Sequence, residues 1–372
     1  MELTRRQVLT ALAALGVSPP SFASSRAPKV VVVRFGGGVR RRETLQPDTT
    51  FSPYLLKHLV PRGVLFRDTV IEQLDGVDTS HAQGTVHLIT GRYGAYEDVS
   101  EQWLGERFEP TVPTIFEAAR RQLGLAEHEV VVVNNENRVQ DEFLTFSSDP
   151  AFRAGSLSRW RYRHWGLARK VADGTATPAD HRQLRRLLDQ DYRLDDTLRQ
   201  QAEPLQRFWT QWAEHWGPSG RVEPRGDRGQ TELALWALRH LRPRLMMINY
   251  SDCDYVHWGI ADHYHRGIAI MDHGLRALTE ALDADPYYRD DTVLVVVPDC
   301  GRDDNRWLPL PYQHHFGDRS AHEIFALFVG PGLRPRIVDR QVQQTDVAAT
   351  IAALLGVSMP DAEGEPLEEV WA

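Results

Sequence analysis

Short apolar runs and longer amphipathic stretches follow one another along most of the 372-residue chain. The apolar runs are continuous rather than alternating, which is typical of strands buried on both faces of a sheet. These predicted strands cover residues 29–35, 64–66, 129–133, 245–250, 292–297 and 324–329. The spacing of apolar residues predicts helices at 54–59, 114–123, 231–241, 264–282 and 344–355.

The alternation of strands and helices predicts the fold class. Apolar strands separated by helices form a doubly wound α/β domain, with a mostly parallel sheet and helices on both faces. The pattern changes between residues 134 and 229, which are polar, rich in arginine and helical in period without a strong strand. We therefore expect a helical insertion at 134–229, between an N-terminal half at 24–133 and a C-terminal half at 230–372.

The first 23 residues have the layout of an export signal. Arg5 and Arg6 precede an apolar run at 8–17, and Ser21 and Ala23 are the small residues expected before a cleavage site. The paired arginines resemble a twin-arginine signal, which predicts recognition by the twin-arginine translocase and a periplasmic or secreted protein. The apolar run is too short to span a bilayer. The alternative is a short N-terminal helix packed on the core.

Composition and charge exclude some classes of function. Hydrophobic residues make up 42% of the chain and charged residues 25%, which is ordinary for a globular protein. The formal net charge of −8 argues against a protein that binds DNA or RNA, because such proteins present a basic face. The two cysteines, Cys253 and Cys300, each stand beside an aspartate and are too few for a disulfide framework.

Side chains that suit a divalent metal ion flank several predicted strands. Asp252, Asp254 and His257 follow one strand, Asp299 follows another, and the histidines between residues 314 and 322 precede a third. In sheets of this class, ligands bind beyond the carboxyl ends of the strands. Carboxylates and imidazoles gathered there are typical of a metal site. The plainest alternative is a generic α/β domain on which these acids and histidines are surface residues.

The order of these motifs resembles the alkaline phosphatase superfamily, which includes sulfatases, nucleotide phosphodiesterases and cofactor-independent phosphoglycerate mutase. The segment LLKHLVPRGVLF at 55–66 is similar to the family's leader helix and following strand, and LITGRY at 88–93 is similar to a sulfatase stretch. Asp254 with its neighbours and Asp299 with the following CGR resemble the family's metal motifs. FALFVGPG at 325–332 resembles its final core strand.

The resemblance implies a metal-dependent hydrolase of phosphate, sulfate or phosphonate esters, with a small-molecule or polymeric ester as substrate. It implies one or two divalent ions, with zinc as the first choice and calcium or manganese as alternatives. Such ions lower the pKa of the nucleophile and neutralise charge on the ester. One ion would take Asp252 or Asp254 with His257 and a later histidine, and the other would take Asp299 and its neighbour. The expected metal ligands are Asp252, Asp254, His257, Asp299, Cys300, His315 and His322.

The resemblance also places the nucleophile shortly before the Thr-Gly pair at 90–91. Counting back from Thr90 puts His81 at that position, and a small insertion would put Thr79 or Ser80 there instead. We therefore expect the catalytic residue to be Thr79, Ser80 or His81. The Cys-x-Pro-Ser-Arg pattern of sulfatases that form formylglycine is absent from the sequence, which argues against that class.

Two departures from the family's pattern leave a second function open. The family has an aspartate just after the first strand, where this chain has Gly36 and Gly37, and a histidine where it has Cys300. The alternative is therefore a catalytically degenerate, metal-binding or scaffold protein on the same fold. Cys300 could bind zinc as a thiolate, or it could form a disulfide with Cys253 in an oxidising compartment.

Overall fold

The computed structural model describes residues 28–72, 79–98, 108–134, 148–190, 202–257, 259–304, 312–314 and 318–372. The signal predicted at 1–23 lies outside these residues, and so does His315. Within the described ranges, no helix combines the length and the hydropathy of a membrane span.

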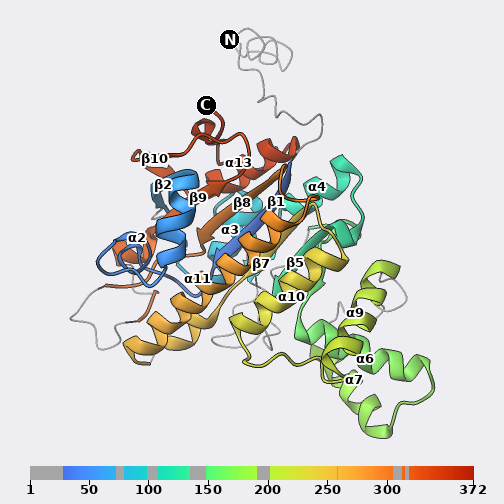
Figure 1. The fold of residues 1–372 in the computed structure, drawn as a ribbon. Helices are drawn as coiled ribbons and strands as arrows, with labels where there is room; N and C mark the ends of the chain where they lie inside the picture. Colours follow the sequence, from blue (N-terminus) through green and yellow to red (C-terminus); the bar gives the residue numbers. More distant parts are fainter. Residues whose placement is uncertain are drawn as a thin grey trace.

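A nine-stranded sheet forms the centre of the molecule (Figure 1). Its strands are β1 (Lys29–Phe35), β2 (Gly63–Val70), β5 (Val130–Asn134), β6 (Gly155–Leu157), β7 (Leu245–Asn249), β8 (Thr292–Pro298), β9 (Glu323–Val329), β10 (Arg336–Val338) and β11 (Val342–Gln343). The order is β10-β2-β9-β8-β1-β7-β5-β6, and β11 pairs with β2. Only β9 is antiparallel to its neighbours among these strands. The predicted mostly parallel α/β fold is confirmed.

The middle strands are buried on both faces, as their continuous apolar sequences predict. In β1, Val31 and Val33 pack in the core on one face, and Val30 and Val32 pack in the core on the other. Arg34 lies in the same strand and is also buried. Because β1 pairs in parallel with both β7 and β8, the carboxyl ends of these three strands lie side by side.

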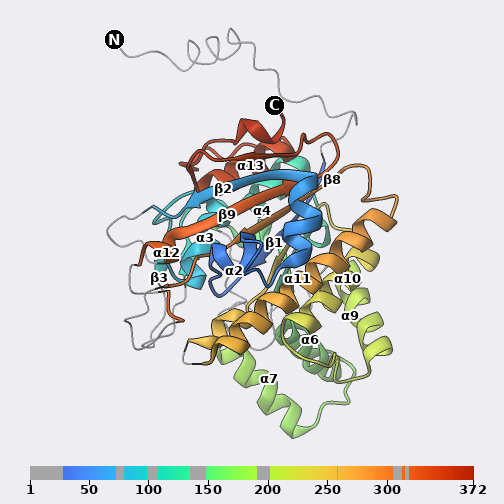
Figure 2. The same ribbon diagram turned by 60° about the vertical axis from the view of Figure 1, so that its left-hand side comes forward.

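Helices cover both faces of the sheet (Figures 1 and 2). In the described residues they are α2 (Arg41–Leu45), α3 (His81–Thr90), α4 (Ile115–Leu123), α6 (Arg159–Ala172), α7 (Pro178–Gln190), α9 (Glu203–Trp216), α10 (Asp227–His240), α11 (Ala261–Ala284), α12 (Arg319–His322) and α13 (Thr345–Leu355). Apolar side chains of α10 and α11 belong to one core, and those of α3, α4 and α13 belong to the other. A small antiparallel pair, β3 (Tyr96–Asp98) and β4 (Phe108–Pro110), lies apart from the main sheet.

The segment expected to be a helical insertion contains α6, α7 and α9, which lie together beyond the β6 end of the sheet (Figure 1). It also contains β6, which extends the sheet beyond β5 although the sequence shows no strong strand there. Three residues of modest hydrophobicity are too short a pattern to recognise. Trp209 and Trp212 of α9 pack in the same core as α10 and α11. The insertion thus shares the main core, and its boundaries stay a prediction.

Candidate functional site

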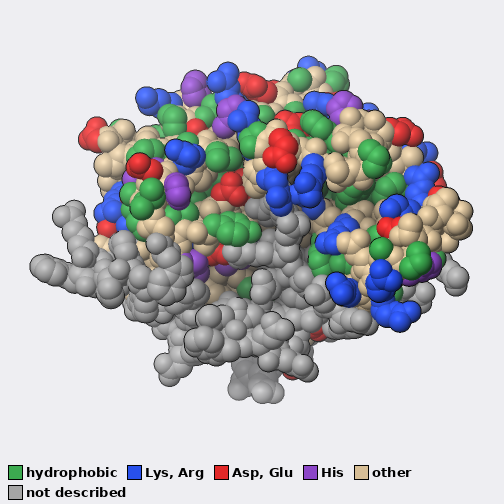
Figure 3. All heavy atoms as spheres, turned by 90° about the horizontal axis from the view of Figure 1, so that it is seen from below, with side chains coloured by type: hydrophobic (Ala, Val, Ile, Leu, Met, Phe, Trp, Pro, Cys, Tyr) green, Lys and Arg blue, Asp and Glu red, His purple; other side chains and the backbone are tan. Residues whose placement is uncertain are grey.

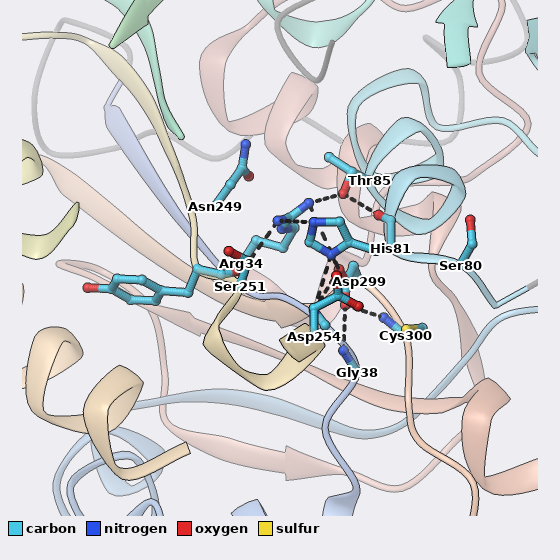
Figure 4. A network of polar contacts seen from close by, with 12 residues as sticks. Arg34, Gly38, Ser80, His81, Thr85, Asn249, Ser251, Asp254, Asp299 and Cys300 are labelled. Carbon is cyan, nitrogen blue, oxygen red and sulfur yellow. Dashed lines mark hydrogen bonds and ion pairs between the residues drawn. The ribbon is translucent and has the colours of Figure 1, made fainter. Parts of the chain in front are cut away.

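The candidate site lies where the carboxyl ends of β1, β7 and β8 meet, against the start of α3 (Figure 4). Ligands of parallel α/β sheets bind at this edge. Ser80 begins α3, because its Oγ accepts a hydrogen bond from the Gln83 backbone N–H at 3.1 Å. Gly91 ends the helix in the left-handed region at φ 67°. These two ends fix His81 and its neighbours at the edge.

Asp254, His257 and His314 form a group of side chains that could hold a metal ion. One ligand atom of each lies within 4.8 Å of the others. His257 Nε2 lies 2.9 Å from Asp254 Oδ1, and His314 Nε2 lies 3.6 Å from the same oxygen. Asp254 and His314 are buried, whereas His257 is half-buried. We call these three residues the Asp-His cluster.

Hydrogen bonds decide which nitrogen of each histidine faces the cluster. His257 Nδ1 donates to Gln313 Oε1 at 3.0 Å, and Gln313 Nε2 donates back to the His257 carbonyl at 2.9 Å, which fixes the orientation of the amide. His314 Nδ1 donates to the Thr79 carbonyl at 2.6 Å. In a neutral imidazole with a proton on Nδ1, Nε2 is an acceptor. When both rings are neutral, two Nε2 acceptors therefore converge on a carboxylate oxygen of Asp254.

Three converging acceptors repel one another unless positive charge lies between them. A divalent cation supplies that charge, and so do additional protons on the imidazoles. Neutral imidazole nitrogens and a carboxylate oxygen form a donor set that zinc uses in proteins. In zinc sites the second nitrogen of each histidine is held by a carbonyl or carboxylate, as Gln313 and Thr79 hold it here. The Asp-His cluster therefore fits a metal ion.

Asp299, at the end of β8, lies next to the cluster and is fully buried. His81 Nδ1 donates to its Oδ2 at 2.5 Å. The backbone N–H groups of Gly37 and Cys300 donate to the carboxylate at 3.2 and 2.8 Å. Burial raises the pKa of Asp299, but the electrostatic interaction and hydrogen bond with His81, helped by Arg34, outweigh it and hold the pKa below its usual value. Asp299 is therefore an ionised carboxylate.

Arg34 brings a buried guanidinium to this carboxylate. Its Nη1 lies 3.9 Å from Asp299 Oδ2 and donates to the Thr85 hydroxyl, and its Nη2 donates to the Tyr250 carbonyl at 3.3 Å. Nη2 also lies 3.1 Å from His81 Nε2. Since a guanidinium can only donate, His81 Nε2 is the acceptor in this contact. Figure 4 shows Arg34 and His81 directed toward each other above Asp299.

Gly36 and Gly37 lie between these groups and leave no room for a side chain. A Cβ on Gly37 would lie 2.2 Å from the Asp254 backbone N, and a Cβ on Gly36 would lie 1.9 Å from the Tyr250 carbonyl oxygen. Gly37 also has φ 83°, a conformation that favours glycine. The aspartate that the resemblance leads one to expect here would therefore collide with the turn after β7. Close approach through Gly37 places the Asp-His cluster beside Asp299.

Four of the residues predicted to bind metal do not join the Asp-His cluster among the described residues: Asp252, Asp299, Cys300 and His322. Asp252 Oδ1 accepts a hydrogen bond from the Asp227 backbone N–H at 3.2 Å and so serves the start of α10. His322 Nδ1 lies 3.0 Å from the Ile71 carbonyl oxygen. Asp299 binds His81 as described. His315 lies outside the described residues.

Cys253 and Cys300 are both free and buried. Cys253 packs in the core beneath α10 and α11, and Cys300 packs in the core on the opposite face. The sheet therefore separates the two thiols, and the disulfide considered from the sequence is not formed. Burial raises the pKa of both thiols well above the ordinary value. A neutral Cys300 thiol packed in the core is a poor zinc ligand.

The three candidate nucleophiles differ in how they face the site. The Thr79 hydroxyl donates to the His314 carbonyl and is fully buried. Ser80 caps α3 and points away from the polar network in Figure 4. His81 is the candidate whose side chain, 13% exposed, contacts Asp299 and Arg34. Of the three candidates, His81 is therefore the one that joins the polar network of Asp299 and Arg34.

The expected ligands left out His314, although it was among the candidate histidines, and sequence reasoning did not single out Gln313 or Arg34. His314 stands beside the predicted ligand His315, and the sequence cannot tell which ring of a histidine pair faces inward. Gln313 carries no signal of its own. Arg34 interrupts an otherwise apolar strand. Because a charged side chain is rarely buried unless it is paired, this arginine could have indicated a buried acidic partner.

Basic, acidic and histidine side chains are interspersed with apolar ones on the described part of the face seen from below (Figure 3). The surface there is of mixed charge.

Comparison with models of known families finds no match to this chain. Comparison with curated protein sequences likewise finds none. Solved structures, in contrast, match over nearly the whole chain. A protein in the alkaline phosphatase superfamily from Vibrio parahaemolyticus is 13% identical with a TM-score of 0.59, and the match covers 98% of this chain and 79% of that one.

Two further structures give the same picture. Wild-type alkaline phosphatase PafA is 11% identical with a TM-score of 0.56, over 94% of this chain and 100% of that one. The phosphonate monoester hydrolase of Agrobacterium radiobacter is 14% identical with a TM-score of 0.53, over 92% and 77%. At these identities a likeness establishes the fold and not the reaction. The chain therefore has the fold of the alkaline phosphatase superfamily.

Proposed function

We propose that this protein is a metal-dependent hydrolase of phosphate esters or of the related sulfate or phosphonate esters. The observation that carries the proposal is the convergence of His257 Nε2, His314 Nε2 and Asp254 Oδ1 at the ligand-binding edge of the sheet. Structures of a phosphatase and of a phosphonate monoester hydrolase share the fold. Zinc is the first choice of metal because imidazole nitrogens and a carboxylate suit it, with calcium or manganese as alternatives.

Asp254, His257 and His314 would hold the ion. When bound, a divalent ion polarises an ester oxygen or activates a hydroxyl or water. Gln313 and the Thr79 carbonyl keep protons on the Nδ1 atoms, so that both Nε2 lone pairs point inward. These contacts give the protein a preorganised site rather than one assembled on binding.

His81 and Asp299 supply the proton chemistry in this proposal. Asp299 accepts the Nδ1 hydrogen of His81 and orients the ring, which leaves Nε2 as the basic atom. Arg34 Nη2 donates to that nitrogen, so this contact must break before Nε2 takes a proton. Thr79 and Ser80 are better explained by their roles in holding His314 and starting α3.

Metal content and turnover test the proposal. We expect protein purified without chelator to contain a divalent metal and to hydrolyse at least one generic phosphomonoester, phosphodiester, phosphonate or sulfate ester. His257→Ala and His314→Ala should each lose metal and turnover, and His81→Gln should keep metal but lose turnover. His263→Ala is the matched control, because this exposed histidine of α11 lies outside the cluster.

Two results would contradict the proposal. Wild-type protein that binds none of these metals would remove its basis. Protein that binds metal through His257 and His314 but turns over none of the esters would favour the alternative, a metal-binding or scaffold protein on the hydrolase fold.

We also propose that the protein is exported, on the strength of the arginine pair and apolar run at 1–23. Fractionation of cells that express the full chain should place it outside the cytoplasm, with cleavage near Ser24. Substitution of Arg5 and Arg6 by Lys should retain the protein inside if the twin-arginine translocase is the route.

A further inference from the structure

The carboxylate of Asp299 has its hydrogen-bonding capacity filled by the protein itself. Oδ1 accepts from the backbone N–H groups of Gly38 and Cys300 at 3.3 and 2.8 Å. Oδ2 accepts from His81 Nδ1 at 2.5 Å and from the Gly37 backbone N–H at 3.2 Å. A carboxylate offers about four lone-pair positions. A metal ion at Asp299 would have to displace one of these buried donors.

The charge at this place is also already balanced. The Arg34 guanidinium lies 3.9 Å from Asp299 Oδ2, and both side chains are fully buried. Arg34 is held in position by the Thr85 hydroxyl and the Tyr250 carbonyl, so it is a fixed part of the edge. A divalent cation beside Asp299 would share the carboxylate with a guanidinium in a poorly solvated site, and the two positive charges would repel each other.

The other ligands that a second ion would need are missing or turned away. Gly36 and Gly37 leave no room for a carboxylate after β1, since added Cβ atoms would meet the Tyr250 carbonyl and the Asp254 backbone. The Cys300 side chain packs in the core on the α3 face. Among the described residues, no group of three or more ligand side chains that could hold a metal ion includes Asp299.

We propose that Arg34 permanently takes the place of a second metal ion, so that the site binds one divalent ion per chain, at the Asp-His cluster. Asp299 is then the counterion of Arg34 and the positioning residue of His81, and it is not a metal ligand. This inference rests on the proposed function only in assuming that the Asp-His cluster binds the first ion. It narrows the substrate to an ester whose charge a single metal ion can meet, because Asp299 already balances the charge of Arg34.

Metal stoichiometry tests this inference without reference to turnover. Full-length protein is stripped with chelator, dialysed against zinc and analysed for metal per chain, and zinc is then titrated calorimetrically. We expect one ion per chain. Asp299→Asn should still bind one ion, with affinity changed by less than about threefold, because loss of a ligand or of its direct support costs about 10-fold or more. His257→Ala should reduce the stoichiometry to zero.

Arg34→Ala provides a second measurement. Removal of the guanidinium leaves the Asp299 carboxylate buried without a cation, so this variant should be less stable, and added guanidinium ion at low concentration should restore part of the lost thermal stability. Arg34→Lys keeps a positive charge but lacks the guanidinium group, so it separates the effect of the charge from that of the guanidinium.

The outcomes separate the two proposals. Two zinc ions per chain in the wild type, with one lost in Asp299→Asn, would overturn the one-ion inference and leave the proposed hydrolase standing. No zinc and no other divalent ion in the wild type would overturn both. One ion that is lost in Asp299→Asn but kept in His257→Ala would place the ion at Asp299 and also overturn the inference.

Discussion

At the scale of single residues, the site depends on positions at which one atom decides the geometry. Gly37 is such a position, because it contacts the backbone of Asp254 while its N–H donates to Asp299. His81 is another, because its two ring nitrogens contact Asp299 and Arg34. The chemistry of this edge thus follows from contacts between residues that are far apart in sequence.

We expect Gly37→Ala to abolish metal binding. The new Cβ would lie 2.2 Å from the Asp254 backbone N, so the turn that carries Asp254 must move. Gly94→Ala is a matched control, because Gly94 also has a positive φ, 65°, but a Cβ there meets nothing within 4 Å. The control should lose only about 1–2 kcal/mol of stability from backbone strain and keep its metal. Equal zinc affinity in both variants, measured by titration, would contradict this account.

At the scale of elements, capped helix ends hold the site and the surrounding fold in position. Ser80 starts α3 at the edge of the sheet, and the next residue is His81. The start of α4 has a full capping box, in which the Thr114 side chain accepts from the Glu117 N–H and the Glu117 carboxylate accepts from the Thr114 N–H. The same carboxylate accepts from the N–H of Asp149. This cap therefore joins α4 to a distant segment as well.

Thr114→Ala should lower the free energy of unfolding by about 1 kcal/mol, because it removes the hydroxyl that caps α4. Urea denaturation followed by circular dichroism measures the change. Thr114→Ser keeps the hydroxyl and should cost less. Both variants should bind zinc like the wild type, since α4 contributes nothing to the Asp-His cluster. An unchanged urea midpoint in Thr114→Ala would show that the cap does not stabilise the fold.

At the scale of the whole molecule, burial couples stability to pH. His87 of α3 is fully buried between the ring of Tyr93 and the side-chain oxygen of Gln344. Burial lowers its pKa to about 4, and the hydrogen bond to Gln344 opposes this shift only in part. The unfolded chain binds a proton at this residue near its ordinary pKa of about 6.5. Between these two values the unfolded state therefore holds more protons than the folded state.

Stability should consequently fall as pH decreases from about 6.5 to about 4, and the contribution of His87 should reach at most about 3 kcal/mol. Carboxylates add their own pH dependence at the lower end of this range. His87→Leu removes the titrating ring and should flatten the pH dependence of the unfolding free energy between pH 5 and 6.5. Parallel slopes for wild type and variant over that interval would contradict a buried, neutral His87.

Much of the fold could be predicted because it is encoded locally. The run at 29–35 coincides with β1, because the four consecutive valines at 30–33 give a clear apolar signal. The strands at 245–250, 292–297 and 324–329 are found within one residue of their predicted ends. β6 was not expected, because three residues give too short a pattern and its pairing with β5 is decided at a distance.

The candidate site was predicted less completely. The sequence by itself determined which loops carry the acids and histidines, because those loops follow strands whose carboxyl ends must meet at one edge. Only the tertiary structure decided that His314 joins Asp254 and His257, and that Asp299 turns to His81 and Arg34. The physical reason is that a side chain's partner depends on distances of a few ångströms across the sheet. Local pattern carries no information about those distances.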